Sequence, residues 1–134
     1  MTVALSSFPG LLRNRGNRAD PALMACSAGD AFEAIYEALY ADQTELSYSE
    51  TSAHVCRYRR FEAVPNGFDV FDGWHAFLIE DRLIGRLVWR GPRALIMEAR
   101  IGTGEFDRVL DRFLAALEQI RLSVSKRSVT PSTP

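Results

Sequence analysis

The 134-residue sequence has few of the features by which a protein class is most easily recognised. It contains only two cysteines, Cys26 and Cys56, and two histidines, His54 and His75, and none stands at metal-site or disulfide-framework spacing. No apolar run approaches the roughly 18 to 20 residues that cross a bilayer. The N-terminus lacks the positive n-region of a secretory signal. These absences predict a cytoplasmic protein with reduced thiols, without a metal or cofactor, and away from the membrane.

Over the whole chain, neither sign of charge is in large excess. Sixteen Lys and Arg residues stand against 17 Asp and Glu residues, giving a formal net charge of −1. A dedicated nucleic-acid binder usually carries a large basic excess. We therefore expect no nucleic-acid partner, and the length fits one compact domain.

The near-zero sum conceals an uneven charge distribution. From Ala19 to Cys56 the sequence has no Lys or Arg, but it has seven acidic residues: Asp20, Asp30, Glu33, Glu37, Asp42, Glu45 and Glu50. Such a surface attracts a basic partner and speeds its association. An ordinary solvated helix face, balanced by arginines from elsewhere in the fold, explains the same pattern. The sequence leaves both interpretations open.

Two helices are indicated by apolar residues at helical spacing. The first spans about 30–41, with Asp30 as a candidate cap, and the second follows Thr103 as its cap, with a stripe running from Phe106 to Ile120. We therefore divide the chain into an irregular N-terminal arm (1–28), a single domain (29–122) and a loose C-terminal tail (123–134).

Four strands are expected between the helices. Alternation in HVCRYRRF predicts a strand over about 53–62, with a further extended piece near Leu46 and Tyr48. Short links then join three strands, which must be antiparallel neighbours, over 74–80, 83–90 and 94–101. The predicted fold is α+β, a four-stranded antiparallel sheet with an N-terminal and a C-terminal helix packed on one face.

Few residues suggest chemistry. Cys56 with His54 or His75 would make a thiol enzyme, although a buried thiol beside a packed imidazole is the commoner arrangement. Gly102-Thr103-Gly104 has the outline of a phosphate loop but lacks its other glycines and its lysine. Trp74 and Trp89 near several arginines could stack on RNA bases, or could simply fill the core.

One stretch carries a family resemblance. DGWHAFLIEDRLIGRLVWRG, followed by a strand and IGTGEFDRVLDRFLAALE, is similar to small immunity proteins of bacterial polymorphic-toxin and contact-dependent growth inhibition systems. The resemblance covers about residues 69–118. It implies a short, cytoplasmic, non-enzymatic α+β protein that binds and neutralises a cognate toxin domain, and it assigns no functional residue.

We therefore expect an immunity protein that occludes the C-terminal toxin domain of its partner and is a monomer before binding. The acidic region supplies the expected contact residues: Asp30, Glu33, Glu37, Tyr40, Asp42, Glu45, Tyr48 and Glu50. A secretion-chaperone-like module is the alternative, which a stable dimer would favour, and a small thiol enzyme is a third.

Overall fold

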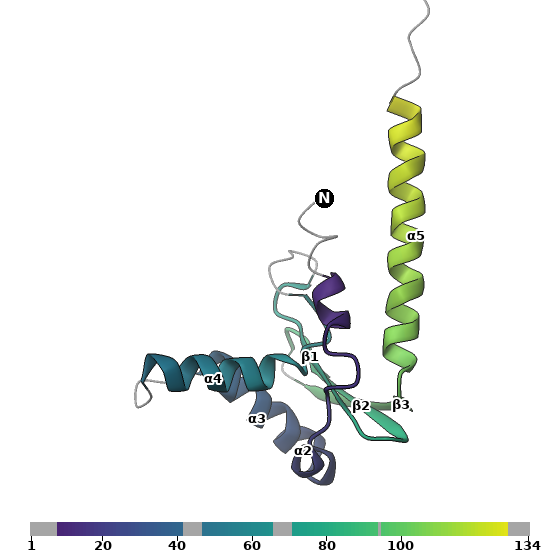
Figure 1. The fold of residues 1–134 in the computed structure, drawn as a ribbon. Coiled ribbons are helices and arrows are strands. Elements are labelled where there is room, and N and C mark those ends of the chain that lie inside the picture. The colour runs from purple at the N-terminus through teal and green to yellow at the C-terminus, as the bar shows by residue number, and fades with distance from the viewer. Residues whose placement is uncertain (1–7, 42–46, 66–70, 94, 129–134) are drawn as a thin grey trace, which may run out of the picture.

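The computed structural model describes residues 8–41, 47–65, 71–93 and 95–128, which form an α+β protein with one antiparallel sheet (Figure 1). The expected α+β class is confirmed. A short helix over 8–12 opens the described chain. The other elements follow in the order α2 (Pro21–Ala25), α3 (Ala28–Tyr40), α4 (Tyr48–Arg59), β1 (His75–Glu80), β2 (Ile84–Arg90), β3 (Ile96–Gly102) and α5 (Glu105–Ser128).

The sheet runs in the order β1-β2-β3, and each neighbouring pair is antiparallel. Asp81 fixes the β1–β2 turn, because its Oδ1 accepts hydrogen bonds from the backbone N–H groups of Leu83 and Ile84, both at 2.8 Å. The strands expected over 74–80, 83–90 and 94–101 are confirmed, with Ala94 outside the described residues.

The expected strand over 53–62 is wrong, because this stretch lies mainly in helix α4. Ser47 and Glu50 form a capping box: the Ser47 hydroxyl accepts from Glu50 N at 3.2 Å, and Glu50 Oε2 accepts from Ser47 N at 2.9 Å. Tyr48, expected in an extended piece, is the first residue of α4, and Leu46 lies outside the described residues. Only a single bridge, Glu62 to Phe77, pairs this region with the sheet, so the described sheet has three strands instead of four.

Helices α3 and α5 lie on opposite faces of the sheet, so the prediction that they share one face is wrong. Alternation along β1 points Phe77 and Glu80 to opposite faces. Phe77 contacts Phe32 of α3, with ring centroids 5.1 Å apart, whereas Glu80 Oε2 accepts from the backbone N–H of Gly104 at the start of α5, at 2.9 Å. Figure 1 shows the same division. Periodicity reveals that a helix has an apolar stripe but does not reveal which face of the sheet receives it.

The core lies between α3 and the face of the sheet that carries Phe77. Phe61, which follows α4, also enters it, so the segment after α4 closes one side of the core. The buried cluster comprises Leu23, Ala31, Phe32, Ile35, Phe61, Phe77, Ile79 and Val88.

Both expected helix caps differ from the observed ones. Ser27 caps α3, since its hydroxyl accepts from Asp30 N at 3.1 Å, and Asp30 lies in the first turn. Thr103 does not cap α5: its hydroxyl donates to the Asp81 carbonyl at 2.8 Å, and α5 begins at Glu105. Residue types that can cap a helix were present in the sequence at both places. Contacts with adjacent segments of the same chain determine which residue serves as the cap.

The N-terminal arm supplies an arginine to the interior. Arg18, 1% exposed, donates to Glu80 Oε1 at 2.9 Å, to Asp107 Oδ2 at 3.0 Å and to the Leu11 carbonyl at 2.8 Å. These bonds join the arm, the end of β1 and the first turn of α5. The arm also contains α2, whose Leu23 belongs to the core. Residues that we expected to form an irregular segment therefore contribute to the packed domain.

Helix α5 projects from the body of the protein (Figure 1). Its first turns pack against β3, and the N-terminal arm also contacts them, because Arg18 pairs with Asp107 and Arg15 pairs with Asp111. It continues to Ser128, so the first half of the expected loose tail is helical. In the same described ranges, no helix is both long enough and apolar enough to cross a membrane.

Candidate protein-binding site

Helix α3 presents a row of acidic and aromatic side chains. Asp30, Glu33, Glu37 and Tyr40 follow one another at steps of three, four and three residues, which places them on one face of the helix. The opposite face is buried, with Phe32 and others in the core. We call the row of Asp30, Glu33, Glu37 and Tyr40 the α3 surface. It brings together four of the eight residues expected to bind a partner.

Tyr40 is held in place by one residue of its own helix and two residues from elsewhere in the fold. Its hydroxyl donates to Glu62 Oε1 at 3.0 Å, and its ring lies 5.0 Å from that of Tyr36 and 4.9 Å from that of His75. Even so, 40% of Tyr40 is exposed. A fixed aromatic ring that is partly exposed loses little conformational entropy on binding, and so can anchor an interface.

Arg90 of β2 reduces the negative charge of the α3 surface at one position. Its Nη1 donates to Glu33 Oε1 at 3.2 Å, and its guanidinium lies over the rings of Phe32 (4.7 Å) and Tyr36 (4.6 Å). Glu33 is therefore partly compensated from within the fold. This is the balancing arginine that the alternative interpretation of the acidic region requires, and it acts at one carboxylate.

His75 adds a neutral group beside the α3 surface. Desolvation lowers the pKa of His75 below its usual value, and the positive charge of Arg90 lowers it further, although Glu62 opposes the shift. The imidazole therefore remains uncharged to lower pH than a free histidine, and adds no positive charge next to Tyr40 at neutral pH.

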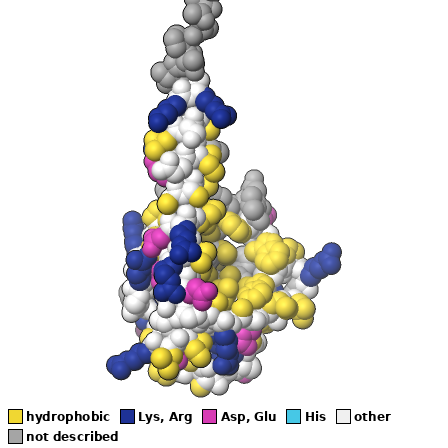
Figure 2. Space-filling view, turned by 90° about the vertical axis from the view of Figure 1, so that its right-hand side faces the viewer, with side chains coloured by type: hydrophobic (Ala, Val, Ile, Leu, Met, Phe, Trp, Pro, Cys, Tyr) yellow, Lys and Arg dark blue, Asp and Glu magenta, His cyan; other side chains and the backbone are white. Residues whose placement is uncertain are grey.

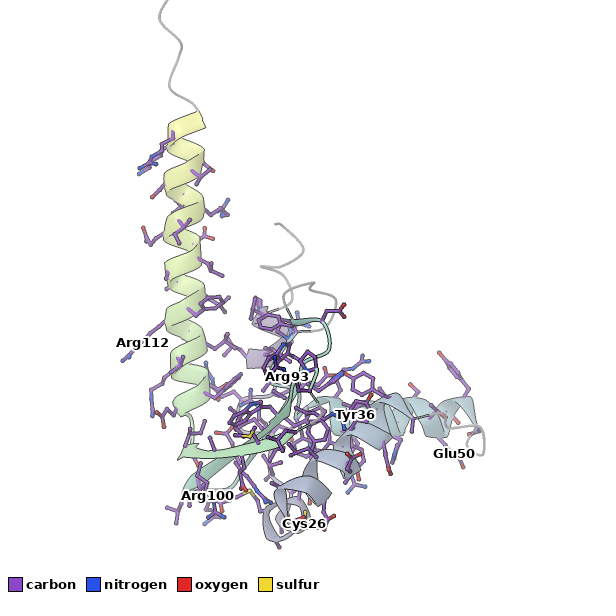
Figure 3. All side chains as sticks on the ribbon, turned by 180° about the vertical axis from the view of Figure 1, so that it is seen from behind. Cys26, Tyr36, Glu50, Arg93, Arg100 and Arg112 are labelled. Atoms are coloured by element: carbon purple, nitrogen blue, oxygen red, sulfur yellow. The ribbon has the colours of Figure 1, made fainter. Side chains whose placement is uncertain are left out.

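The second half of the expected site lies on a different helix from the first. Tyr48 and Glu50 lie in the first turn of α4, and Figure 3 shows Glu50 at one end of that helix, away from Tyr36 of α3. Tyr48 is 91% exposed. Glu50 is engaged in the capping box, so its carboxylate already has a structural role. Asp42 and Glu45 lie outside the described residues.

Sequence reasoning missed Glu62, His75 and Arg90 as neighbours of α3. No local pattern links them to the helix, because they come from the segment after α4 and from two strands. One signal was present: Arg90 shares a strand face with Val88, and that face is the one that α3 covers. Assigning the helix to a face would have placed an arginine beside the acidic row.

The thiol-enzyme alternative is not supported by the geometry. Cys56 and His54 are two residues apart on α4, a spacing that directs side chains to different sides of a helix. The His54 ring instead lies 5.0 Å from that of Tyr58, whereas His75 lies against Tyr36 and Tyr40. Among the residues described, no group of three or more His, Cys, Asp or Glu could hold a metal ion.

The geometry also does not support the nucleic-acid and phosphate alternatives. Trp89 alternates with Arg86 and Arg90 along β2, so the two arginines point to the other face of the sheet. The N–H of Gly104, which a phosphate would need, donates to the Glu80 carboxylate at 2.9 Å. A side chain of the protein therefore already occupies the anion position at this helix N-terminus.

The chain is thus an α+β protein with an acidic and aromatic surface on helix α3. Residues 1–116 match the family model described as Immunity protein 42, and the chain belongs to this family. The structure is also similar to the crystal structure of CdiI from Burkholderia dolosa AUO158, with 20% sequence identity and a TM-score of 0.68 over 86% of this chain and 70% of that one. No curated protein sequence matches the chain.

Proposed function

We propose that this chain is the immunity partner in a contact-dependent growth inhibition system, and that it binds a cognate toxin domain in the cytoplasm and covers its active or binding surface. Membership of the Immunity protein 42 family is the observation that carries this proposal. The likeness of the fold to CdiI from Burkholderia dolosa supports the choice of system. The role needs no catalysis by the immunity protein, because occlusion is enough.

The contact surface that we propose is the α3 surface together with the residues that follow it. The carboxylates of Asp30 and Glu37 would face basic groups of the toxin, in the place of the anion that such groups normally bind. Tyr40 and the exposed Tyr48 would supply apolar contact area. The proposed residues are Asp30, Glu33, Glu37, Tyr40, Asp42, Glu45, Tyr48 and Glu50.

A charge reversal tests this surface. Glu37→Lys changes a carboxylate of the α3 surface that has no capping role, and denaturant unfolding with far-UV circular dichroism checks that the variant is folded. Association with the toxin domain should slow by about tenfold or more, and the salt dependence of the association rate should decrease. Stopped-flow association with the cognate toxin domain measures both.

The matched control is Glu118→Lys on α5. Glu118 is also an exposed helical carboxylate, and it pairs with Arg121 of its own helix. This variant changes the net charge by the same amount but lies away from α3, so we expect an association rate close to that of the wild type. If both variants slowed association equally, the effect would come from the net charge of the chain. That result would refute the proposed location of the contact surface.

A further inference from the structure

A cleft lined by three arginines lies where the N-terminal arm meets the end of α4. The arm contributes Arg13, and the end of α4 contributes Arg59 and Arg60. The cleft has a volume of about 600 Å³, and Cys56 and Glu62 also line it. Cys56, Arg59 and Arg60 share one side of α4, because the two arginines follow the cysteine by three and four residues. We call this the arginine cleft.

The positive charge of the arginine cleft is not neutralised by ion pairs within the described parts of the chain. No carboxylate described there forms an ion pair with Arg13, Arg59 or Arg60. The α5 side of the molecule differs. Figure 2 shows basic side chains close to acidic ones along the lower part of that helix, and Arg15 forms an ion pair with Asp111. The arginine cleft is therefore suited to an anionic partner.

Arg60 is already held in a defined position. Its Nη2 donates to the Ala19 carbonyl at 3.0 Å, and its guanidinium lies 4.6 Å from the centre of the Phe61 ring. Its Nε is buried and has no hydrogen-bond partner among the described residues, so the fold leaves part of its donor capacity unused. A guanidinium that is positioned in advance loses little conformational entropy when it binds, and its planar donors match a carboxylate.

Glu62 connects the arginine cleft to the α3 surface. It lines the cleft, and its Oε1 accepts the hydrogen bond from the Tyr40 hydroxyl at 3.0 Å. Tyr40 is the last residue of α3 and the last member of the α3 surface. An acidic surface and a basic cleft therefore meet at one side-chain contact, and a partner that covers this contact borders both.

We propose that the arginine cleft receives an acidic segment of the toxin domain, so that the toxin contact has a negative part on α3 and a positive part in the cleft. This inference rests on the proposed function. Parts of opposite sign fix the orientation in which a partner binds. A cleft of about 600 Å³ has room for a few side chains. The chain lacks the basic excess of a nucleic-acid binder, which favours an acidic protein segment.

Charge reversal at Arg59 tests the cleft. Arg59→Glu should raise the Kd for the cognate toxin domain at least about tenfold, because it places a carboxylate against an acidic segment. Arg57→Glu is the matched control, since Arg57 is also exposed and belongs to the same last turn of α4 but does not line the cleft. We expect its Kd to stay within about threefold of the wild-type value. Denaturant unfolding and far-UV circular dichroism check that both variants are folded.

The thiol of Cys56 gives a second measurement that needs no variant. Cys56 is exposed and lines the arginine cleft. A saturating amount of the toxin domain should slow its alkylation by iodoacetamide at least about tenfold, because the bound segment blocks access to the sulfur. Peptide mass spectrometry measures the rate at this position with and without the toxin domain.

Several outcomes distinguish this inference from the proposed function. Toxin binding that Arg59→Glu leaves unchanged, or weakens no more than Arg57→Glu does, would overturn the cleft proposal alone. Alkylation of Cys56 at the same rate in the complex would do so too. Failure of the wild-type chain to bind the toxin domain would refute the proposed function, and this inference with it. If the chain binds a polyuridine oligonucleotide, and Arg59→Glu abolishes only that binding, the cleft belongs to RNA.

Discussion

Two buried arginines connect parts of the chain that are distant in sequence. Arg18 holds the N-terminal arm against β1 and α5, and Arg86 of β2 donates to the carbonyls of Leu23 (2.8 Å) and Cys26 (2.6 Å) and to Glu98 Oε1 (2.6 Å). In an arginine-rich sequence nothing local distinguishes these residues from exposed ones such as Arg15. Their roles follow from the tertiary fold and could not be predicted from spacing.

Removing Arg18 should strongly destabilise the protein. Arg18→Ala leaves the carboxylates of Glu80 and Asp107, 7% and 3% exposed, without their shared partner. Breaking such a buried group costs about 3–5 kcal/mol. Denaturant unfolding measures this cost, and Arg15→Ala is the control, because the Arg15–Asp111 pair is exposed and contributes at most about 1 kcal/mol. Similar losses from both variants would contradict the importance given to Arg18.

At the scale of elements, the first turn of α4 depends on its capping box. Ser47→Ala removes the acceptor for Glu50 N and should reduce stability by about 0.5–2 kcal/mol. Hydrogen exchange should show the amides at the start of α4 losing protection first. Ser52→Ala, farther along the same helix, should be neutral or slightly stabilising because alanine favours helix. Unchanged exchange in Ser47→Ala would show that the box does not stabilise α4.

The long periodic elements could be predicted from the sequence, and the short ambiguous one could not. The stripes of α3 and α5 repeat over several turns, and the hairpin around Asp81 has clear turn residues. By contrast, the alternation of Cys56, Arg57, Tyr58 and Arg59 covers only four positions, and it fits a strand and an amphipathic helix turn about equally well. Ser47 and Glu50, which precede this stretch and form the capping box, indicate a helix more clearly.

The candidate site could be predicted only within one helix. A period of 3.6 places Asp30, Glu33, Glu37 and Tyr40 on one face, and the structure has them there. Whether Tyr48 and Glu50 lie beside them depends on how α4 packs against α3. The pairing of Glu33 with Arg90 depends on which face of the sheet receives α3. Neither is encoded in the local sequence.

At the scale of the whole molecule, the sheet separates the α3 surface from helix α5. The α3 surface lies on one side of the sheet, and α5 rises on the other (Figure 1). The proposed toxin contact on α3 therefore lies on the opposite side of the sheet from α5.

The central claim is that this chain neutralises a toxin by binding it. Calorimetric titration of the full chain into the cognate toxin domain tests it most directly. We predict saturation at one chain per toxin domain with a Kd in the nanomolar range or tighter, accompanied by loss of toxin activity. No binding, or binding that leaves the toxin fully active, would contradict the account.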